Sequence, residues 1–389
     1  MDYKLLSEVS VYRKDRISSD KVNKENYIST ENMLPNRGGV ESATTVASAK
    51  TFSAYKKGDI LLSNIRPYFK KIWYADKEGG CSNDVLVVKA GKSVDSKFLY
   101  YVLSDNNFFN YSTVTSKGTK MPRGSKNAIM KYWVPDLDLP TQKKIADILS
   151  SYDELIKANN ERIELLEQVA QELYKEWFVR FRFPGYENAK FEDGIPKGWT
   201  IKRLADYGRV ETGKTPSTDV LENYGGEMMF VKTPDMHGNI FIIQTEDKLS
   251  ERGHNAQPKK LLPANSIMVS CIGTAGVVSI NAEPAHTNQQ INSIILNNPN
   301  ELEWLYHTCK SLKDTIELFG ATGATMTNLS KGKFEKLKVV DPREDLILEY
   351  HNKVHPLFNE IKSLMYQNQN LAAQRDMLLP RLMSGKLEV

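Results

Sequence analysis

The sequence predicts an α+β protein: two mixed α/β domains in tandem repeat, separated by a pair of long antiparallel coiled-coil helices. The first supporting observation is an internal repeat. Residues 59–65 (DILLSNI) resemble residues 266–272 (SIMVSCI), 207 positions later, and a long internal repeat indicates a duplicated structural module. The second observation is a heptad pattern of apolar residues that closes each copy of the repeat.

The repeat divides the chain into four segments. We expect a first domain over residues 1–140, a first helix over 141–180, a linker and second domain over 181–344, and a second helix over 345–389. Each domain contains short β-branched runs interrupted by Gly, Pro, Asn and Ser. This pattern is typical of strands in a compact mixed domain.

The two helices carry apolar residues spaced alternately four and three apart, over residues 145–177 and 350–382. An antiparallel pair with Asn159 opposite Asn368 matches apolar residues layer by layer, and two buried amides that hydrogen-bond each other would fix the register. A parallel pair is the alternative. We expect Pro356 to kink or restart the second helix. The candidate coiled-coil and partner-docking residues are Ile156, Asn159, Ile163, Leu166, Tyr174, Trp177, Phe178, Ile361, Leu364, Asn368, Leu371 and Leu378.

Composition permits nucleic-acid binding without requiring it, since the net charge is +4 and the pI is near 8.6. Residues 116–135 hold five basic side chains and no acidic one, and residues 331–338 hold four with only Glu335 against them. A solvated face is the other interpretation of either run. No apolar stretch is long enough for a membrane span and no signal pattern opens the chain, so we expect a cytoplasmic protein with no membrane partner.

One motif suggests a nucleotide site. Residues 208–215 match the phosphate-loop pattern GxxxxGK[ST]. That loop works between a buried strand and a helix, yet residues 202–207 are not an apolar strand and Pro216 interrupts the expected helix. We therefore do not predict nucleotide binding.

The sequence contains no persuasive catalytic constellation. His351 and His355 are the only histidines spaced i, i+4, and they lack the Glu of an HExxH motif, so we do not expect a metal site. The loops of a DNA methyltransferase are also missing. We predict a protein that is not an enzyme and binds no cofactor itself.

Polar loops are the best candidates for contacts with DNA. Residues 64–71 place one Arg, two Lys and two aromatic rings after a predicted strand, while residues 115–123 and their counterpart 320–328 are rich in small polar side chains. The two copies differ most here, as expected if each reads a different sequence, although ordinary connecting loops would also differ. The candidate DNA-binding residues are Arg66, Lys70, Lys71, Lys117, Thr119, Lys120, Arg123, Lys126, Lys214, Thr215, Ser270, Thr274, Gln289, Thr325, Thr327, Asn328 and Lys331.

Several segments resemble one known family. Residues 139–149 (LPTQKKIADIL), 161–179 (ERIELLEQVAQELYKEWFV) and 371–385 (LAAQRDMLLPRLMSG) are similar to parts of the specificity subunit of type I restriction-modification systems. Residues 183–187 and 194–199 resemble it too, and so does the GKTPST start of the second domain, which accounts for the phosphate-loop match. Residues 341–345 and Pro356 depart from the family pattern, which puts the docking surface of the second helix in question.

The resemblance implies two target-recognition domains that read the halves of a bipartite double-stranded DNA target through the major groove. It also implies that the helices dock two methyltransferase subunits, which bind S-adenosylmethionine and methylate adenine, and that a restriction subunit can join. Tyr174, Trp177 and Phe178 are docking candidates, although the core of the helix pair is the other role for Trp177. The alternatives are a coiled-coil scaffold with two protein-binding heads, which would show no salt-dependent DNA affinity, and a nucleotide-hydrolysing switch.

Overall fold

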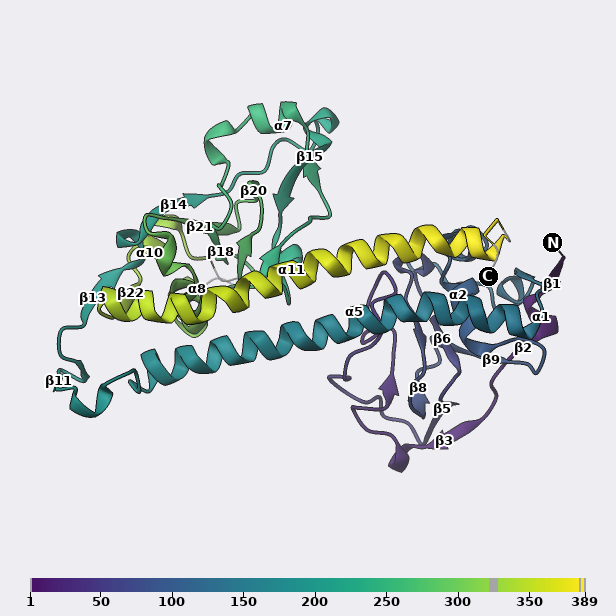
Figure 1. Ribbon diagram of the computed structural model, residues 1–389. Coiled ribbons are helices and arrows are strands. Elements are labelled where there is room, and N and C mark those ends of the chain that lie inside the picture. The colour runs from purple at the N-terminus through teal and green to yellow at the C-terminus, as the bar shows by residue number, and fades with distance from the viewer. Residues whose placement is uncertain (1, 322–327, 385, 388–389) are drawn as a thin grey trace. The chain divides into compact units, whose positions relative to one another are not determined.

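The computed structural model describes residues 2–321, 328–384 and 386–387 (Figure 1). The chain forms two compact units. Unit 1 comprises Met1–Lys157 and Gln369–Val389, and unit 2 comprises Ala158–Asn368. The two long helices contribute to both units, so each unit contains one mixed α/β domain and a stretch of each helix. Within the described residues no helix is long and apolar enough to cross a membrane.

Unit 1 contains two four-stranded sheets and a two-stranded one. The first has the order β2-β9-β6-β7 and the second the order β3-β5-β8-β4, while β1 pairs with β10. Strand β6 is an unbroken apolar run whose Ile60, Leu61 and Leu62 are all buried, as expected of a strand covered on both faces. The strands are β1 (Tyr3–Leu5), β2 (Ser10–Tyr12), β3 (Arg16–Ser18), β4 (Tyr27–Ile28), β5 (Thr51–Tyr55), β6 (Ile60–Ser63), β7 (Ile72–Tyr74), β8 (Gly79–Cys81), β9 (Val85–Ala90) and β10 (Trp133–Pro135).

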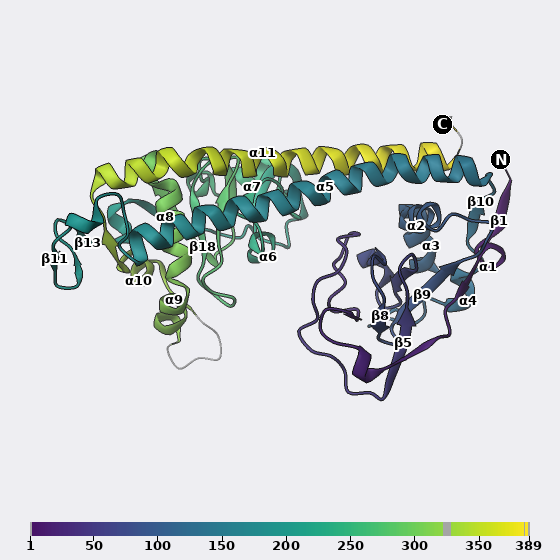
Figure 2. The same ribbon diagram turned by 60° about the horizontal axis from the view of Figure 1, so that its bottom comes forward.

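Helices α2 and α3 of unit 1 lie between the first turns of α5 and the sheet (Figure 2). Each begins at an aspartate whose side chain accepts hydrogen bonds from backbone N–H groups, Asp95 for α2 and Asp105 for α3. The core beneath them joins β6 and β9 to the start of α5 and the end of α11. The helices are α1 (Leu6–Val9), α2 (Ser96–Ser104), α3 (Asn106–Val114) and α4 (Lys126–Ile129).

Unit 2 contains a five-stranded sheet of order β14-β21-β18-β19-β16, a three-stranded sheet of order β17-β15-β20, and two strand pairs, β13-β22 and β11-β12. Its strands are β11 (Phe191–Glu192), β12 (Ile195–Pro196), β13 (Thr200–Arg203), β14 (Gly208–Thr212), β15 (Tyr224–Val231), β16 (Phe241–Ile242), β17 (Lys248–Leu249), β18 (Ile267–Ser270), β19 (Val278–Asn281), β20 (Ala285–Thr287), β21 (Ile291–Leu296) and β22 (Lys338–Asp341). Its helices are α6 (Thr233–Met236), α7 (Glu251–Asn255), α8 (Leu302–Ser311), α9 (Lys313–Gly320) and α10 (Lys331–Glu335).

The internal repeat of the sequence is a repeat of structure. Strands β6, β7 and β9 of unit 1 pair in the same antiparallel order as β18, β19 and β21 of unit 2. In each copy the middle strand pairs with both neighbours at one residue, Ile60 with Tyr74 and Val88 and Ile267 with Ile280 and Ile294. Helices α2, α3 and α4 correspond in order to α8, α9 and α10. The prediction of two mixed α/β domains in tandem is confirmed.

Helix α5 spans Leu139–Tyr174 and continues as a π-helical turn, Lys175–Val179, while α11 spans Glu344–Met383. The expectation that the second helix restarts at Pro356 is wrong, because α11 is helical throughout, while a kink at Pro356 stays a prediction. Pro356 removes one hydrogen bond, to the carbonyl of Asn352, and both residues are exposed, so water can bind that carbonyl. The buried side chains of Val354 and Phe358 hold the helix on either side.

Buried histidines make the stability of unit 2 depend on pH. Burial lowers the pKa of His286 to about 4, with nearby His254 adding to the effect, and lowers that of His307 to about 3, against about 6.5 in an unfolded chain. Between these pH values the unfolded state binds more protons than the folded state does. The contribution of the two neutral histidines to the free energy of unfolding is therefore fully present above pH 6.5 and decreases as the pH falls. We expect unit 2 to lose about 2 kcal/mol per histidine between pH 7.5 and 4.5. Urea unfolding at both pH values tests this, and an equal pH dependence in His307→Gln would contradict it.

Candidate nucleic-acid interface

Three polar loops meet beside the β6–β7 hairpin of unit 1. The backbone N–H of Arg37 donates to the carbonyl of Lys70 (2.9 Å), and that of Arg66 donates to the carbonyl of Pro122 (2.8 Å). Arg37, Arg66 and Lys70 all have positive φ angles, of 63°, 49° and 53°. Non-glycine residues adopt this conformation only where the surrounding structure enforces it, and such positions concentrate at binding sites. The loops therefore form one fixed surface.

The loop that follows α3 supplies most of the accessible charge on this surface. Its ends are joined by reciprocal backbone hydrogen bonds between Lys117 and Arg123, both 2.9 Å. Arg123 is exposed but also pairs with Asp84 at 3.2 Å. The predicted residues Lys117, Thr119, Lys120, Arg123 and Lys126 are all exposed. They are available for contact with phosphates, which lysine and arginine bind electrostatically.

The basic residues of the preceding loop are used largely within the fold. Lys70 Nζ donates to Asn106 Oδ1 (2.9 Å), and Lys71 Nζ donates to the carbonyl of Thr30 (2.7 Å). Burial lowers the pKa of the Lys71 ammonium group. Arg66 is half-buried, and its Nε has no hydrogen-bond partner among the described residues. Lys70 and Lys71 therefore hold the loop in place, and their role in DNA binding stays a prediction.

In unit 2, the predicted residues Lys214, Thr215 and Gln289 come together on the surface. The backbone N–H of Lys214 donates to the carbonyl of Thr287 (2.9 Å), and the Thr215 hydroxyl donates to Gln289 Oε1. A Cβ on Gly213 would lie 2.2 Å from the carbonyl oxygen of Asn288. This glycine thus permits close packing of the chain, and no helix follows it as a phosphate loop would require.

The remaining predictions in unit 2 have mixed outcomes. Ser270 is fully buried: its hydroxyl donates to the carbonyl of Thr274 (2.6 Å) and accepts from the N–H of Val277 (2.9 Å). It stabilises a turn, so its assignment as a DNA-binding residue is corrected. Thr274, Asn328 and Lys331 are exposed. Thr325 and Thr327 lie outside the described residues.

The asparagines predicted to face each other do so in unit 2. Asn159 Nδ2 donates to Asn368 Oδ1 (2.8 Å), and Asn368 Nδ2 donates to Asn160 Oδ1 (2.8 Å). Farther along, the Tyr350 hydroxyl donates to the carbonyl of Ala170 (3.1 Å). The stretches of α5 and α11 inside unit 2 therefore run antiparallel. The predicted seam residues Ile163, Leu166, Ile361 and Leu364 are half-buried or buried there, and in unit 1 Ile156, Leu371 and Leu378 are half-buried.

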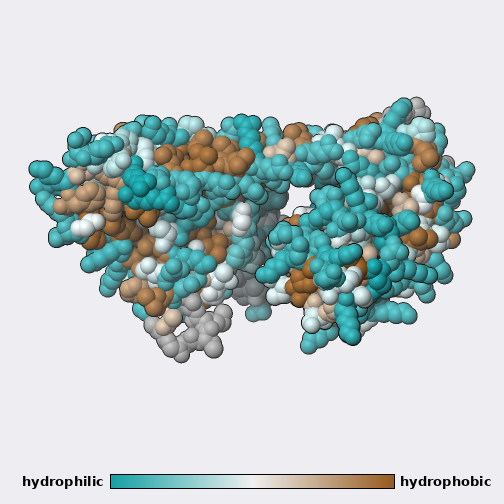
Figure 3. Space-filling model, turned by 90° about the horizontal axis from the view of Figure 1, so that it is seen from below, coloured by the Kyte–Doolittle hydropathy of each residue, from teal (hydrophilic) through white to brown (hydrophobic). Residues whose placement is uncertain are grey.

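Tyr174, Trp177 and Phe178 are buried in the core of unit 2, which corrects the assignment of Tyr174 and Phe178 as docking residues and agrees with a core role for Trp177. The Trp177 ring is 6% exposed and lies 6.0 Å from the ring of Tyr350, while the Tyr174 hydroxyl hydrogen-bonds Thr308 at 3.1 Å. These rings attach the end of α5 to the second domain. The large apolar side chains that α5 exposes are Leu139, Ile148, Leu155, Leu165 and Val169, of which the last three are the most exposed. Apolar side chains gather on the surface over the helices of unit 2 (Figure 3).

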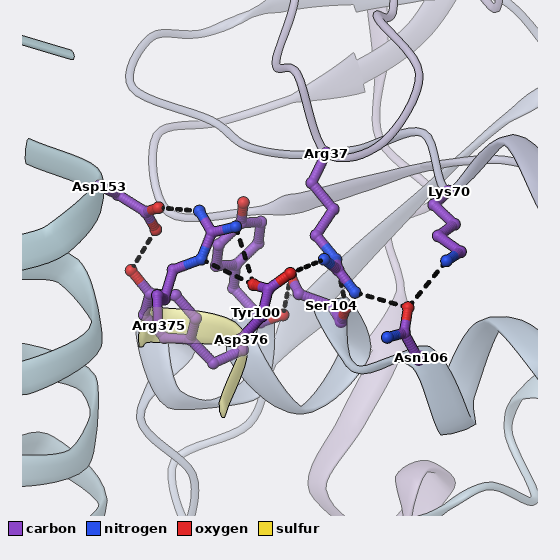
Figure 4. A network of polar contacts seen from close by, with 9 residues as sticks. Arg37, Lys70, Tyr100, Ser104, Asn106, Asp153, Arg375 and Asp376 are labelled. Carbon is purple, nitrogen blue, oxygen red and sulfur yellow. Dashed lines mark hydrogen bonds and ion pairs between the residues drawn. The ribbon is translucent and has the colours of Figure 1, made fainter. Parts of the chain in front are cut away.

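Sequence reasoning missed a polar network that fixes the loops of unit 1 to the end of α11 (Figure 4). Arg37 donates to Asp376 Oδ2 (2.9 Å), to the carbonyl of Ser104 (2.6 Å) and to Asn106 Oδ1 (2.8 Å). Arg375 in turn donates to Asp153 and Asp376. Arg37 and Asp376 are 339 positions apart, so no local pattern could have revealed the contact.

Replacing Arg37 with Met is expected to lower the free energy of unfolding of unit 1 by about 2 kcal/mol. The side chain makes three hydrogen bonds, two of them with side chains from other elements, and bonds of charged groups are among the stronger ones. Arg37→Lys should recover only part of this, because one ammonium group cannot reproduce the guanidinium fork. Thermal unfolding measures the effect, and stability equal to that of the unchanged protein would refute this role.

Comparisons with known proteins agree with this architecture. The model of the type I restriction modification DNA specificity domain matches residues 5–168 and 196–344, one match for each copy of the repeat. The HindI specificity subunit of Haemophilus influenzae is 31% identical over 401 residues, covering 86% of this chain and 87% of that protein. The MjaIX specificity subunit of Methanocaldococcus jannaschii is 28% identical, covering 76% and 70%.

A solved structure shares the fold. The S subunit of a type I restriction-modification system from M. genitalium superposes with a TM-score of 0.57 over 98% of this chain and 95% of that one, at 16% identity. The fold is thus that of a protein built from two copies of one mixed α/β domain. The chain belongs to the family of type I restriction-modification specificity subunits. Its part in such a system is DNA sequence specificity, and it is not a catalytic subunit.

Proposed function

We propose that the chain binds a bipartite double-stranded DNA target, with each domain reading one half, and that it docks two methyltransferase subunits which modify that target. A restriction subunit can join the same complex. Family membership establishes DNA sequence specificity; the bipartite form of the target and the assembly with other subunits are what we propose.

One observation supports a target with two different halves: the two domains share a framework but present different side chains on it. Ile65 pairs with Arg123 in unit 1, and Ile272 pairs with Asn328 at the corresponding place in unit 2. Around the first bridge the exposed residues include Lys117, Lys120 and Arg123, and around the second the described exposed residues include Thr274, Asn328 and Lys331. Because base edges are distinguished by the donors and acceptors presented to them, the two copies would select different sequences.

We infer that α5 and α11 form one antiparallel coiled-coil pair that separates the two recognition domains. The antiparallel contacts near Asn159 in unit 2 support this, as does the ion pair between Arg375 and Asp153 in unit 1. The seam itself is occupied by this chain. Partner subunits would therefore meet the outer face of α5, where Leu155, Leu165 and Val169 are exposed among polar residues.

In this proposal S-adenosylmethionine is bound by the methyltransferase subunits. Methylation of a base requires a pocket that accepts the flipped nucleotide, whereas choosing the site requires only contacts with the groove and the backbone. The two tasks can thus be placed on separate chains, and the loops described above suit the second task.

The test is co-expression of this chain with the methyltransferase subunit encoded beside it, in a host without the system, followed by sequencing of methylated bases. We expect one new methylated motif made of two short defined halves around an unspecified spacer. The methyltransferase alone is the control and should give no such motif. If the subunits assemble but no motif appears, and DNA binding is insensitive to salt, the scaffold with protein-binding heads would replace this proposal.

A further inference from the structure

Three metal-ligating side chains meet in unit 2, away from the polar loops. Glu303 lies on α8, and His351 and His355 lie on α11. His351 Nδ1 is 2.7 Å from Glu303 Oε2, and His355 Nδ1 is 2.8 Å from Glu303 Oε1. One ligand atom from each residue lies within 4.8 Å of the others. The carboxylate thus joins two imidazoles through its two oxygens.

The arrangement follows from helix geometry. Residues i and i+4 occupy the same face of a helix, so the two imidazoles lie side by side, with ring centroids 4.6 Å apart. Glu303 is the second residue of α8 and meets this face of α11. Two imidazole nitrogens and a carboxylate are a known ligand set for zinc and other divalent transition metals. The i, i+4 spacing was visible in the sequence, but the third ligand came from a different helix.

The burial of the carboxylate indicates a need for positive charge. The Glu303 side chain is 0% exposed, and within the described part of the chain its ion-pair partners are these two histidines. A neutral imidazole supplies a hydrogen bond but no charge, and an ionised carboxylate is unfavourable in the interior unless its charge is compensated. A divalent cation at the meeting point of the three side chains would compensate it.

There is also room for a further ligand. A hollow of about 370 Å³ is lined by His351 and His355 together with Asn265, Ser266 and Asn300. His351 is nearly buried while His355 is about half exposed, so the cluster lies at the inner edge of this hollow. Water could complete a four-coordinate site from that side, as in zinc sites with three protein ligands.

We propose that Glu303, His351 and His355 form a binding site for a divalent transition metal, for which Zn²⁺ is the test ion. Each imidazole keeps one proton on Nε2 and binds the metal through Nδ1, and one oxygen or both oxygens of Glu303 complete the protein ligands. The ion would fasten α8 of the recognition domain to α11. This proposal does not depend on the proposed bipartite target or on partner docking.

The experiment uses the untagged full chain, stripped with a chelator and titrated with Zn²⁺ by calorimetry. We expect one equivalent to bind, and the thermal midpoint of unfolding to rise with Zn²⁺ concentration, because an ion that binds only the folded state stabilises it. His355→Gln and Glu303→Gln should each weaken the affinity by at least about tenfold. His237→Gln, which removes an exposed histidine of the same unit, is the matched control and should bind as the unchanged protein does.

Circular dichroism establishes that each variant is folded. Because Glu303 is buried, the Zn²⁺ affinity of Glu303→Gln is interpreted only if this variant folds. If it does not fold, His355→Gln, which changes a half-exposed residue, provides the comparison. Binding of Co²⁺, followed by its visible absorption, reports the coordination directly and should vanish in His355→Gln. If the unchanged protein binds no more Zn²⁺ than His355→Gln does, or if His237→Gln weakens binding equally, the proposal is overturned and the three side chains form only a hydrogen-bonded cluster.

Discussion

Replacing Trp177 with Ala is expected to lower the free energy of unfolding of unit 2 by about 3–5 kcal/mol, the usual range for removing a buried aromatic ring. The indole is packed against Phe178 and Tyr350 in the core. Its loss would leave a cavity where the end of α5 joins the second domain. Urea unfolding, followed by tyrosine and tryptophan fluorescence and by circular dichroism, measures this change.

Leu165→Ala is the matched control on the same helix. Leu165 is 61% exposed, so its truncation should change stability by less than about 0.5 kcal/mol. If the outer face of α5 docks methyltransferase subunits, the same substitution should weaken their association, measured by co-purification. Should Trp177→Ala leave stability unchanged and instead abolish association, Trp177 would be a docking residue after all.

The second large effect concerns the basic loop of unit 1. Changing Lys117, Lys120 and Lys126 together to Gln is expected to reduce the salt dependence of DNA binding, making the negative slope of log affinity against log salt shallower by about 3. Each exposed lysine that contacts a phosphate displaces a counterion, so removing three contacts removes three such displacements. The loss of affinity should be similar for target DNA and unrelated DNA, because phosphate contacts carry no sequence information.

A charge-matched variant separates this effect from net charge alone. Lys56, Lys57 and Lys77 are also exposed, but they lie at the opposite end of the β6–β7 hairpin, where the N–H of Gly58 bonds the carbonyl of Ala75. Changing these three to Gln should leave the salt slope nearly unchanged. An equal decrease in both variants would show that the Lys117–Lys126 loop is not the contact surface.

The architecture was predictable because its signals are periodic. The repeat and the heptads indicate which residues are equivalent, and they predict Asn159 opposite Asn368, as the hydrogen bond between the two side chains shows. Periodicity does not state what else packs against a helix. Tyr174 and Phe178 were assigned to a docking face because the pattern could not show that the second domain folds over the end of α5.

The candidate site was less predictable, because hydrogen bonds between distant segments leave no local signal. Ser270 looked suitable for DNA contact, yet its hydroxyl is satisfied by main-chain groups four and seven positions away. The pair of histidines on α11 lacked the local glutamate of a familiar motif, while their carboxylate partner lies 48 positions before His351. In both cases the partners of a side chain came from tertiary packing, which residue type and spacing do not show.

The central claim is that the two domains read separate halves of the target, and exchanging one domain tests it most directly. Residues 1–140 would be replaced by the corresponding residues of the Haemophilus influenzae relative, and the chimera would be co-expressed with the methyltransferase subunit before methylated bases are sequenced. We predict that one half of the methylated motif changes and the other half stays the same. A motif in which both halves change, or neither does, would contradict the account.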